Sequence, residues 1–327
     1  MTVAIVPFAP DPVRAAAVDA EVRAAVADSI ATVLAPLQAQ GAIAADDAVS
    51  IVASVRGAGG PGAVGAYVEL VEAIHRDRPG DARAALDALA AASGRRGPGL
   101  RCVTLVDGDL GHGQADRYRR IIADDPTTPI SIRPLDPPAM AREAARVSAA
   151  LALLDRGAPE AAGELRALIR EIVLVGPDGA GAGFGGATSF HLWGALFLNA
   201  EAHPGRLALA EALVHECGHA LLFGLAGGGR LVEGTDDGRH ASPLRDDPRP
   251  MDGVVHATFV LARMAWCMER LLAAGVLDRD EQAAARAAAA GHRRLFADGL
   301  AEIATHARLT PTGRAALAGA AAWIGGV

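Results

Sequence analysis

The sequence predicts an α+β protein that is mostly helical and contains one small mixed sheet. Hydrophobic residues make up 51% of the 327-residue chain but aromatic residues only 4%, a composition typical of helices that pack through small side chains. Long segments space their apolar residues with a helical period, and a few short runs are apolar and β-branched. The length allows one large domain or two ordinary ones.

The N-terminal region, residues 1–98, is expected to be helical from residue 11 to about residue 95. Asp11 and Pro12 provide a helix N-cap and a first-turn proline. Residues 94–99 are rich in glycine, arginine and proline, which interrupts the helical pattern. We therefore place the first domain boundary there.

The central region, residues 99–275, alternates strand-like and helical segments. Four short apolar runs predict strands at 100–106, 129–134, 171–177 and 193–199. Helices are expected at 137–156 and 159–170, and a long, strongly apolar helix at 252–274. The remaining region, residues 276–327, predicts two alanine-rich helices that pack on this core, at 279–307 and 310–324.

The motif that carries chemistry is His215-Glu216-Cys-Gly-His219, inside the predicted helix 211–223. Residues four apart lie on one face of a helix, so the two histidines can bind one metal ion. Glu216 lies between them, where it can reach an open coordination position. A strand shortly before this helix indicates a zincin-like arrangement, in which the small sheet packs on the metal-binding helix.

A third metal ligand must come from elsewhere in the chain. His256 lies in the first turns of the apolar helix 252–274, and a lone histidine in such a place is usually a hydrogen-bonded core residue. Because the two-histidine site lacks a ligand, we nevertheless predict that His256 binds the metal. Glu233, Asp236 and Asp237 are acidic alternatives in a polar loop.

Charge and cysteine content exclude several classes of function. A net charge of −7 provides no basic surface for nucleic acid. Three widely spaced cysteines give no disulfide framework, and no apolar run is long enough for a signal peptide or a membrane span. We therefore expect a cytoplasmic protein with no nucleic-acid or membrane partner. The sequence does not indicate the oligomeric state.

Residues from about 140 to 270 resemble the HExxH-type 2-oxoglutarate-dependent peptide β-hydroxylases that modify ribosomally synthesised peptides. The resemblance rests on the HExxH helix and on the run Pro243-Leu-Arg-Asp-Asp-Pro-Arg-Pro-Met-Asp-Gly-Val-Val-His256. It implies an Fe(II) site of His215, His219 and His256. It also implies that Arg249 or Arg245 binds the distal carboxylate of 2-oxoglutarate, since the planar guanidinium suits a carboxylate.

The resemblance further implies that the substrate is a precursor peptide, hydroxylated at a side-chain β-carbon, and that Glu216 orients a ligand or a water molecule. Two other functions fit the residues. In a zinc metallopeptidase, Glu216 would be the general base that activates a zinc-bound water. In a non-catalytic helical partner-binding protein, the metal would be structural, although a structural zinc ion usually takes four protein ligands.

Overall fold

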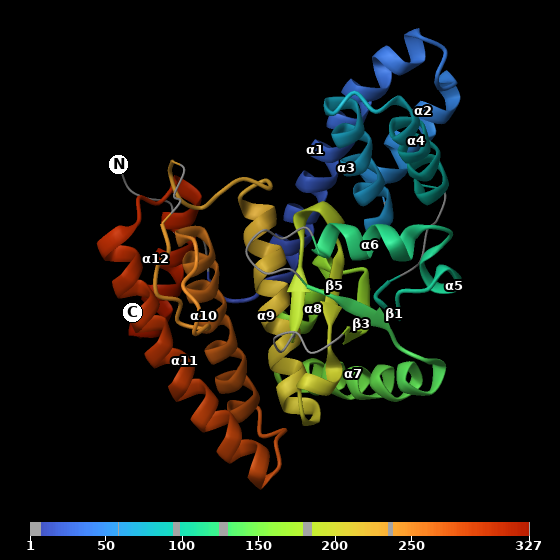
Figure 1. The fold of residues 1–327 in the computed structure, drawn as a ribbon. Helices are drawn as coiled ribbons and strands as arrows, with labels where there is room; N and C mark the ends of the chain where they lie inside the picture. Colours follow the sequence, from blue (N-terminus) through green and yellow to red (C-terminus); the bar gives the residue numbers. More distant parts are fainter. Residues whose placement is uncertain are drawn as a thin grey trace. The chain divides into compact units, whose positions relative to one another are not determined.

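The computed structural model describes residues 8–57, 59–93, 99–123, 130–178, 185–234 and 238–326. Their fold is mostly helical with a five-stranded mixed sheet, which confirms the predicted class (Figure 1). The chain forms two compact units, each built from separate segments. Unit 1 comprises Met1–Val13, Ala145–Leu165 and His203–Val327, and unit 2 comprises Arg14–Ala144 and Arg166–Ala202.

This division differs from the sequential domains predicted at 1–98, 99–275 and 276–327. The helices before residue 94 and the sheet belong to one unit, and the HExxH helix belongs to the other. Parallel strands explain part of the difference, since they need long crossover connections and therefore draw on distant parts of the chain. The predicted boundary at residue 98 lies outside the described residues.

Unit 2 begins with a group of helices whose apolar faces share one core. They are α1 (Pro12–Ala39), α2 (Ala45–Gly57), α3 (Pro61–His75) and α4 (Pro79–Ser93). Ile30, Val55, Leu70 and Leu89, one from each helix, are all almost fully buried in this core. Pro61 stands in the first turn of α3, where its missing N–H costs no hydrogen bond.

The sheet of unit 2 has the strand order β1-β3-β5-β4, and β2 pairs separately with β3. The strands are β1 (Arg101–Val103), β2 (Ile132–Pro134), β3 (Glu171–Pro177), β4 (Gly186–Thr188) and β5 (Ala195–Leu198). The first, third and fifth strands are parallel, whereas β2 and β4 run antiparallel to β3 and β5 respectively. The central strand β3 is buried along its first six residues, as its continuous apolar sequence predicts.

Short elements complete unit 2. The helices α5 (Asp107–Leu110) and α6 (Gln114–Ala123) follow β1, and the 3-10 turns η1 (Phe190–Leu192) and η2 (Ala200–Ala202) flank β5. Tyr118 of α6 is buried and donates a hydrogen bond of 2.8 Å to Glu171 of β3.

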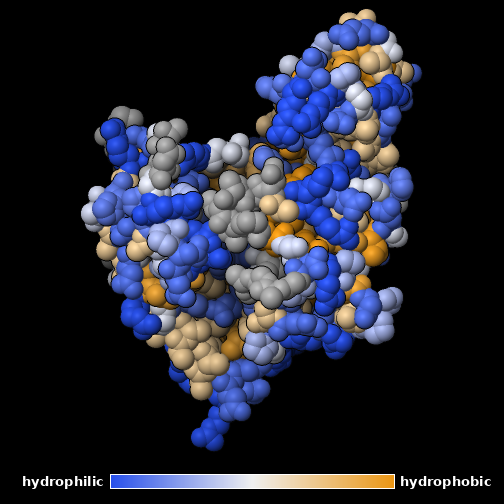
Figure 2. Space-filling model, in the orientation of Figure 1, coloured by the Kyte–Doolittle hydropathy of each residue, from blue (hydrophilic) through white to orange (hydrophobic). Residues whose placement is uncertain are grey.

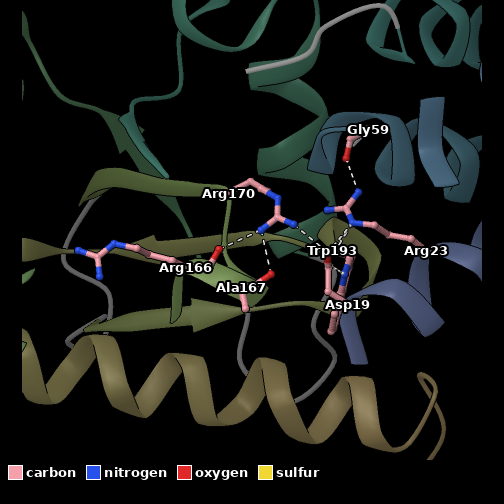
Figure 3. Close-up of polar contacts among 7 residues, drawn as sticks. All are labelled: Asp19, Arg23, Gly59, Arg166, Ala167, Arg170 and Trp193. Carbon is pink, nitrogen blue, oxygen red and sulfur yellow. Dashed lines mark hydrogen bonds and ion pairs between the residues drawn. The ribbon is translucent and has the colours of Figure 1, made fainter. Parts of the chain in front are cut away.

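A buried network around Asp19 fastens α1 to the sheet segment of the same unit (Figure 3). Its carboxylate accepts hydrogen bonds from Arg23 Nε at 2.9 and 3.0 Å, from Arg170 Nη2 at 2.8 Å and from Trp193 Nε1 at 2.8 Å. Arg23 also donates to the carbonyl oxygen of Gly59 at 2.6 Å. One carboxylate therefore pairs with two arginines and also accepts a hydrogen bond from a tryptophan.

Unit 1 contains most of α7 (Pro137–Gly157) and of α8 (Pro159–Leu168), followed by four helices from the later part of the chain. These are α9 (Gly205–Leu225), α10 (Met251–Ala273), α11 (Arg279–His306) and α12 (Pro311–Gly325). Asp278 and Glu281 form a reciprocal capping box at the start of α11. Thr310 caps α12 by accepting a hydrogen bond from Gly313, as its position before Pro311 predicts.

Small residues let the helices of unit 1 approach closely, and Figure 1 shows α9, α10 and α11 side by side. A Cβ atom at Gly218 of α9 would lie 3.0 Å from Val260 Cγ1 of α10. A Cβ atom at Gly299 of α11 would overlap the Thr258 hydroxyl of α10. The close approach positions the side chains of α9 against those of α10.

Hydrophilic residues cover most of the visible face of each unit, and smaller apolar areas lie among these hydrophilic residues (Figure 2). Among the residues that the structure describes, no helix is both long and apolar enough to span a membrane.

Candidate metal centre

The two histidines of the HExxH motif lie at the spacing of metal ligands. His215 and His219 lie on one face of α9, and their Nε2 atoms are 3.1 Å apart. Metal–nitrogen distances of about 2.0–2.1 Å put two ligands of one ion roughly 3.0–3.4 Å apart. This pair therefore has the geometry that the motif predicts.

The structure brings His256 of α10 next to this pair. Its Nδ1 atom lies 3.2 Å from Nδ1 of His219, and the two rings stack at a centroid distance of 5.4 Å. His219 thus faces its two neighbours with different nitrogens, whereas one ion takes one nitrogen from each ring. An ion bound by all three histidines requires one ring to rotate.

Burial keeps these imidazoles neutral, which is the form that binds a metal. It lowers the pKa of His219 to about 3, with a further contribution from His256, and lowers the pKa of His256 to about 4. The pKa of His215 is lowered well below its usual value, first by burial and then by the neighbouring His219.

Glu216 is buried, with 5% of its surface exposed, and its Oε1 atom lies 3.8 Å from Nε2 of His215. The carboxylate is therefore beside the nitrogen that would bind the metal. At this place it can hold a ligand or a water molecule by hydrogen bonding.

The structure distinguishes the two predicted arginines. The side chain of Arg249 is 7% exposed, and its Nη2 atom lies 2.9 Å from Oδ2 of Asp247. The side chain of Arg245 is 43% exposed and pairs with the other oxygen of Asp247 at 3.0 Å. The hydrogen bond from Arg245 is the main reason why the pKa of Asp247 is lowered.

The acidic alternatives for the third ligand lie elsewhere or outside the described residues. Glu233 is 45% exposed at its side chain and pairs with Arg308 at 3.3 Å. Asp236 and Asp237 are outside the described residues.

The structure also brings together a second cluster, which the sequence did not reveal. Within the described part of the chain, one group of three ligand atoms has all members within 4.8 Å of one another, and it comprises His240, Glu302 and His306. The i,i+4 spacing of Glu302 and His306 on the predicted helix 279–307 was the available sequence signal. His240, from a loop 62 residues earlier, carried no such signal.

In comparisons with known proteins, no protein-family model and no curated protein matches this chain.

Proposed function

We propose that the protein is an Fe(II)- and 2-oxoglutarate-dependent oxygenase that hydroxylates a side-chain β-carbon of a ribosomally synthesised precursor peptide. One observation carries the proposal: His219 lies next to both His215 and His256 where helices α9 and α10 pack, and the buried cation Arg249 lies just before α10 in the same unit. The resemblance of these motifs to the peptide β-hydroxylases supplies the reaction.

The donor set fits iron. Imidazole is a suitable ligand for Fe(II), and three protein ligands leave coordination positions open for a cosubstrate. When bound, iron and 2-oxoglutarate would supply oxidative hydroxylation, in which 2-oxoglutarate loses carbon dioxide and takes one atom of dioxygen to become succinate, while the other oxygen atom enters a substrate C–H bond. The protein has to bind the keto acid, place the peptide and keep bulk water away.

Arg249 is the better candidate for the distal carboxylate of 2-oxoglutarate. A buried guanidinium binds an anion more strongly than an exposed one, because water competes less. Asp247, its present partner, is half exposed, so an incoming carboxylate can take its place. The side chain of Arg245 is nearly half exposed and would contribute little.

Anaerobic titration of the Fe(II)-loaded protein with 2-oxoglutarate tests the proposal through the weak metal-to-ligand charge-transfer band in the visible region. We expect the band in the native protein and its loss in His256→Ala. Arg249→Ala should raise the Kd for 2-oxoglutarate by about 10- to 100-fold, since a charged hydrogen bond contributes roughly 1.5–3 kcal/mol. Arg245→Ala, the matched control, should change it less than about fivefold.

Absence of the band in a protein that binds iron stoichiometrically would contradict the oxygenase. Equal effects of the two arginine variants would leave the iron site but remove Arg249 from its assigned role.

A zinc metallopeptidase is the second candidate, favoured by the buried Glu216 carboxylate 3.8 Å from His215 Nε2. At that position a carboxylate can act as general base on a metal-bound water. Peptide cleavage by the zinc-loaded protein, abolished in Glu216→Gln, would favour the peptidase. Hydroxylation that depends on 2-oxoglutarate would favour the oxygenase.

A further inference from the structure

We infer that His240, Glu302 and His306 form a second divalent-metal site, suited to zinc, which fastens the loop before α10 to α11. The Oε1 atom of Glu302 lies 3.5 Å from Nδ1 of His240 and 3.8 Å from Nε2 of His306. The two imidazole rings have a centroid distance of 5.2 Å. The second site shares no residue with the HExxH centre.

The donor set is that of a zinc site with an open position. Two imidazoles and one carboxylate are common protein ligands of Zn²⁺, and the fourth position is taken by water in such sites. An ion 2.0–2.2 Å from each donor would place the donors roughly 3.0–3.6 Å apart, close to the present distances of 3.5 and 3.8 Å from Glu302 to the two histidines.

Backbone geometry presents two of the three ligands. Glu302 and His306 lie one turn apart on α11, so they share a face. Glu302 Oε1 also accepts a hydrogen bond from the backbone N–H of Ala241 at 3.3 Å, which holds the carboxylate beside the loop. The side chains of His240 and Glu302 are only partly exposed, at 16% and 25%.

The backbone of His240 connects the second site to Arg249. Its backbone forms a two-bond antiparallel bridge with Arg249: His240 N–H donates to the Arg249 carbonyl at 2.8 Å, and Arg249 N–H donates to the His240 carbonyl at 2.9 Å. A metal bound at His240 therefore restrains the backbone of Arg249. The second site is a clamp that holds this loop against α11.

Zinc titration against a competing chelator tests the inference. We expect two zinc ions per native chain and one per chain in His306→Ala, whose altered side chain is about half exposed. Glu302→Gln should raise the Kd of the second zinc ion by at least tenfold. The double variant His215→Ala/His219→Ala should retain the clamp ion and lose the other.

His112→Ala is the matched control, because His112 is fully exposed and, like His306, has a carboxylate neighbour, Asp107 at 3.1 Å. It should leave both zinc ions in place. If His306→Ala binds zinc with the stoichiometry and affinity of the native chain, the inference of a second site is wrong. That result would not bear on the oxygenase, which is tested by iron and 2-oxoglutarate.

Amide hydrogen exchange tests the clamp separately. Zinc should slow exchange of the His240 and Arg249 amides in the native protein and have no such effect in His306→Ala. Unchanged exchange in the zinc-loaded native protein would overturn the clamp.

Discussion

The Nδ1 atom of His219 lies 3.2 Å from the Nδ1 atom of His256, although 37 residues separate them in the chain. Each histidine belongs to a different helix, so their meeting depends on how closely α9 and α10 pack. A metal ion that binds both would therefore join the two helices and should stabilise the fold.

Metal binding should raise the melting temperature, and His256→Ala should reduce that increase. A ligand at 100 times its Kd adds about 2.7 kcal/mol to the free energy of unfolding. The comparison is made with Fe(II) under anaerobic conditions in a His306→Ala background, which excludes the second cluster. Equal increases with and without His256 would remove it from the ligand set.

Two glycines of α11 should respond oppositely to alanine. At Gly299 the added Cβ would overlap the Thr258 hydroxyl, and overpacking of this kind costs about 1–3 kcal/mol. At Gly291 the added Cβ meets nothing within 4 Å, so alanine should stabilise the helix by about 0.5–1 kcal/mol. Urea denaturation measures both. Stabilisation by Gly299→Ala would contradict the close packing of α10 and α11.

Removal of the Asp19 carboxylate should strongly destabilise unit 2. Asp19→Ala leaves Arg23 and Arg170 without their shared counter-charge, and breaking a buried ion pair costs about 3–5 kcal/mol. Asp28→Ala is the control, since the Asp28–Arg56 pair is exposed and should be worth less than about 1 kcal/mol. Thermal unfolding distinguishes them. Similar losses would mean that the network of Figure 3 contributes no more than a surface pair.

Glu281 should make the start of α11 sensitive to acid. Its pKa is lowered mainly by hydrogen bonds from Arg206, with two N–O distances of 2.7 Å. A carboxyl group with a lowered folded-state pKa stabilises the protein above its unfolded-state pKa and loses that contribution as pH falls through the lowered value. Glu281→Gln should therefore destabilise the protein at pH 7 and have a smaller effect at pH 3. An equal loss at both pH values would contradict the ionic contribution.

Local patterns predicted the long helices well. The helix predicted at 252–274 is α10 at Met251–Ala273, and the one predicted at 310–324 is α12 at Pro311–Gly325. Caps and apolar periodicity are set by neighbouring residues, so the sequence contains them directly. The spacing of His215 and His219 was accessible for the same reason.

Features that depend on distant partners were not predicted. The polar helix α6, which contains three arginines, was not predicted. Its residue Tyr118 is buried against Glu171, which lies 53 residues away in the chain. Strand β4 has only three residues and exists through its pairing with β5. The difference in burial between Arg245 and Arg249 likewise follows from tertiary structure. The zincin-like packing of the sheet on the HExxH helix stays a prediction.

The interleaved segments of unit 1 have a consequence for how the protein is made. Phe8 accepts a hydrogen bond from Arg263, 255 residues later, and α10 packs along α11 near the end of the chain. During synthesis, the residues of unit 2 have all emerged by Ala202, whereas unit 1 still lacks every histidine of the metal centre. Ribosome-bound chains should therefore acquire the sheet before they can acquire a metal, and no single cut releases unit 1 as one continuous fragment.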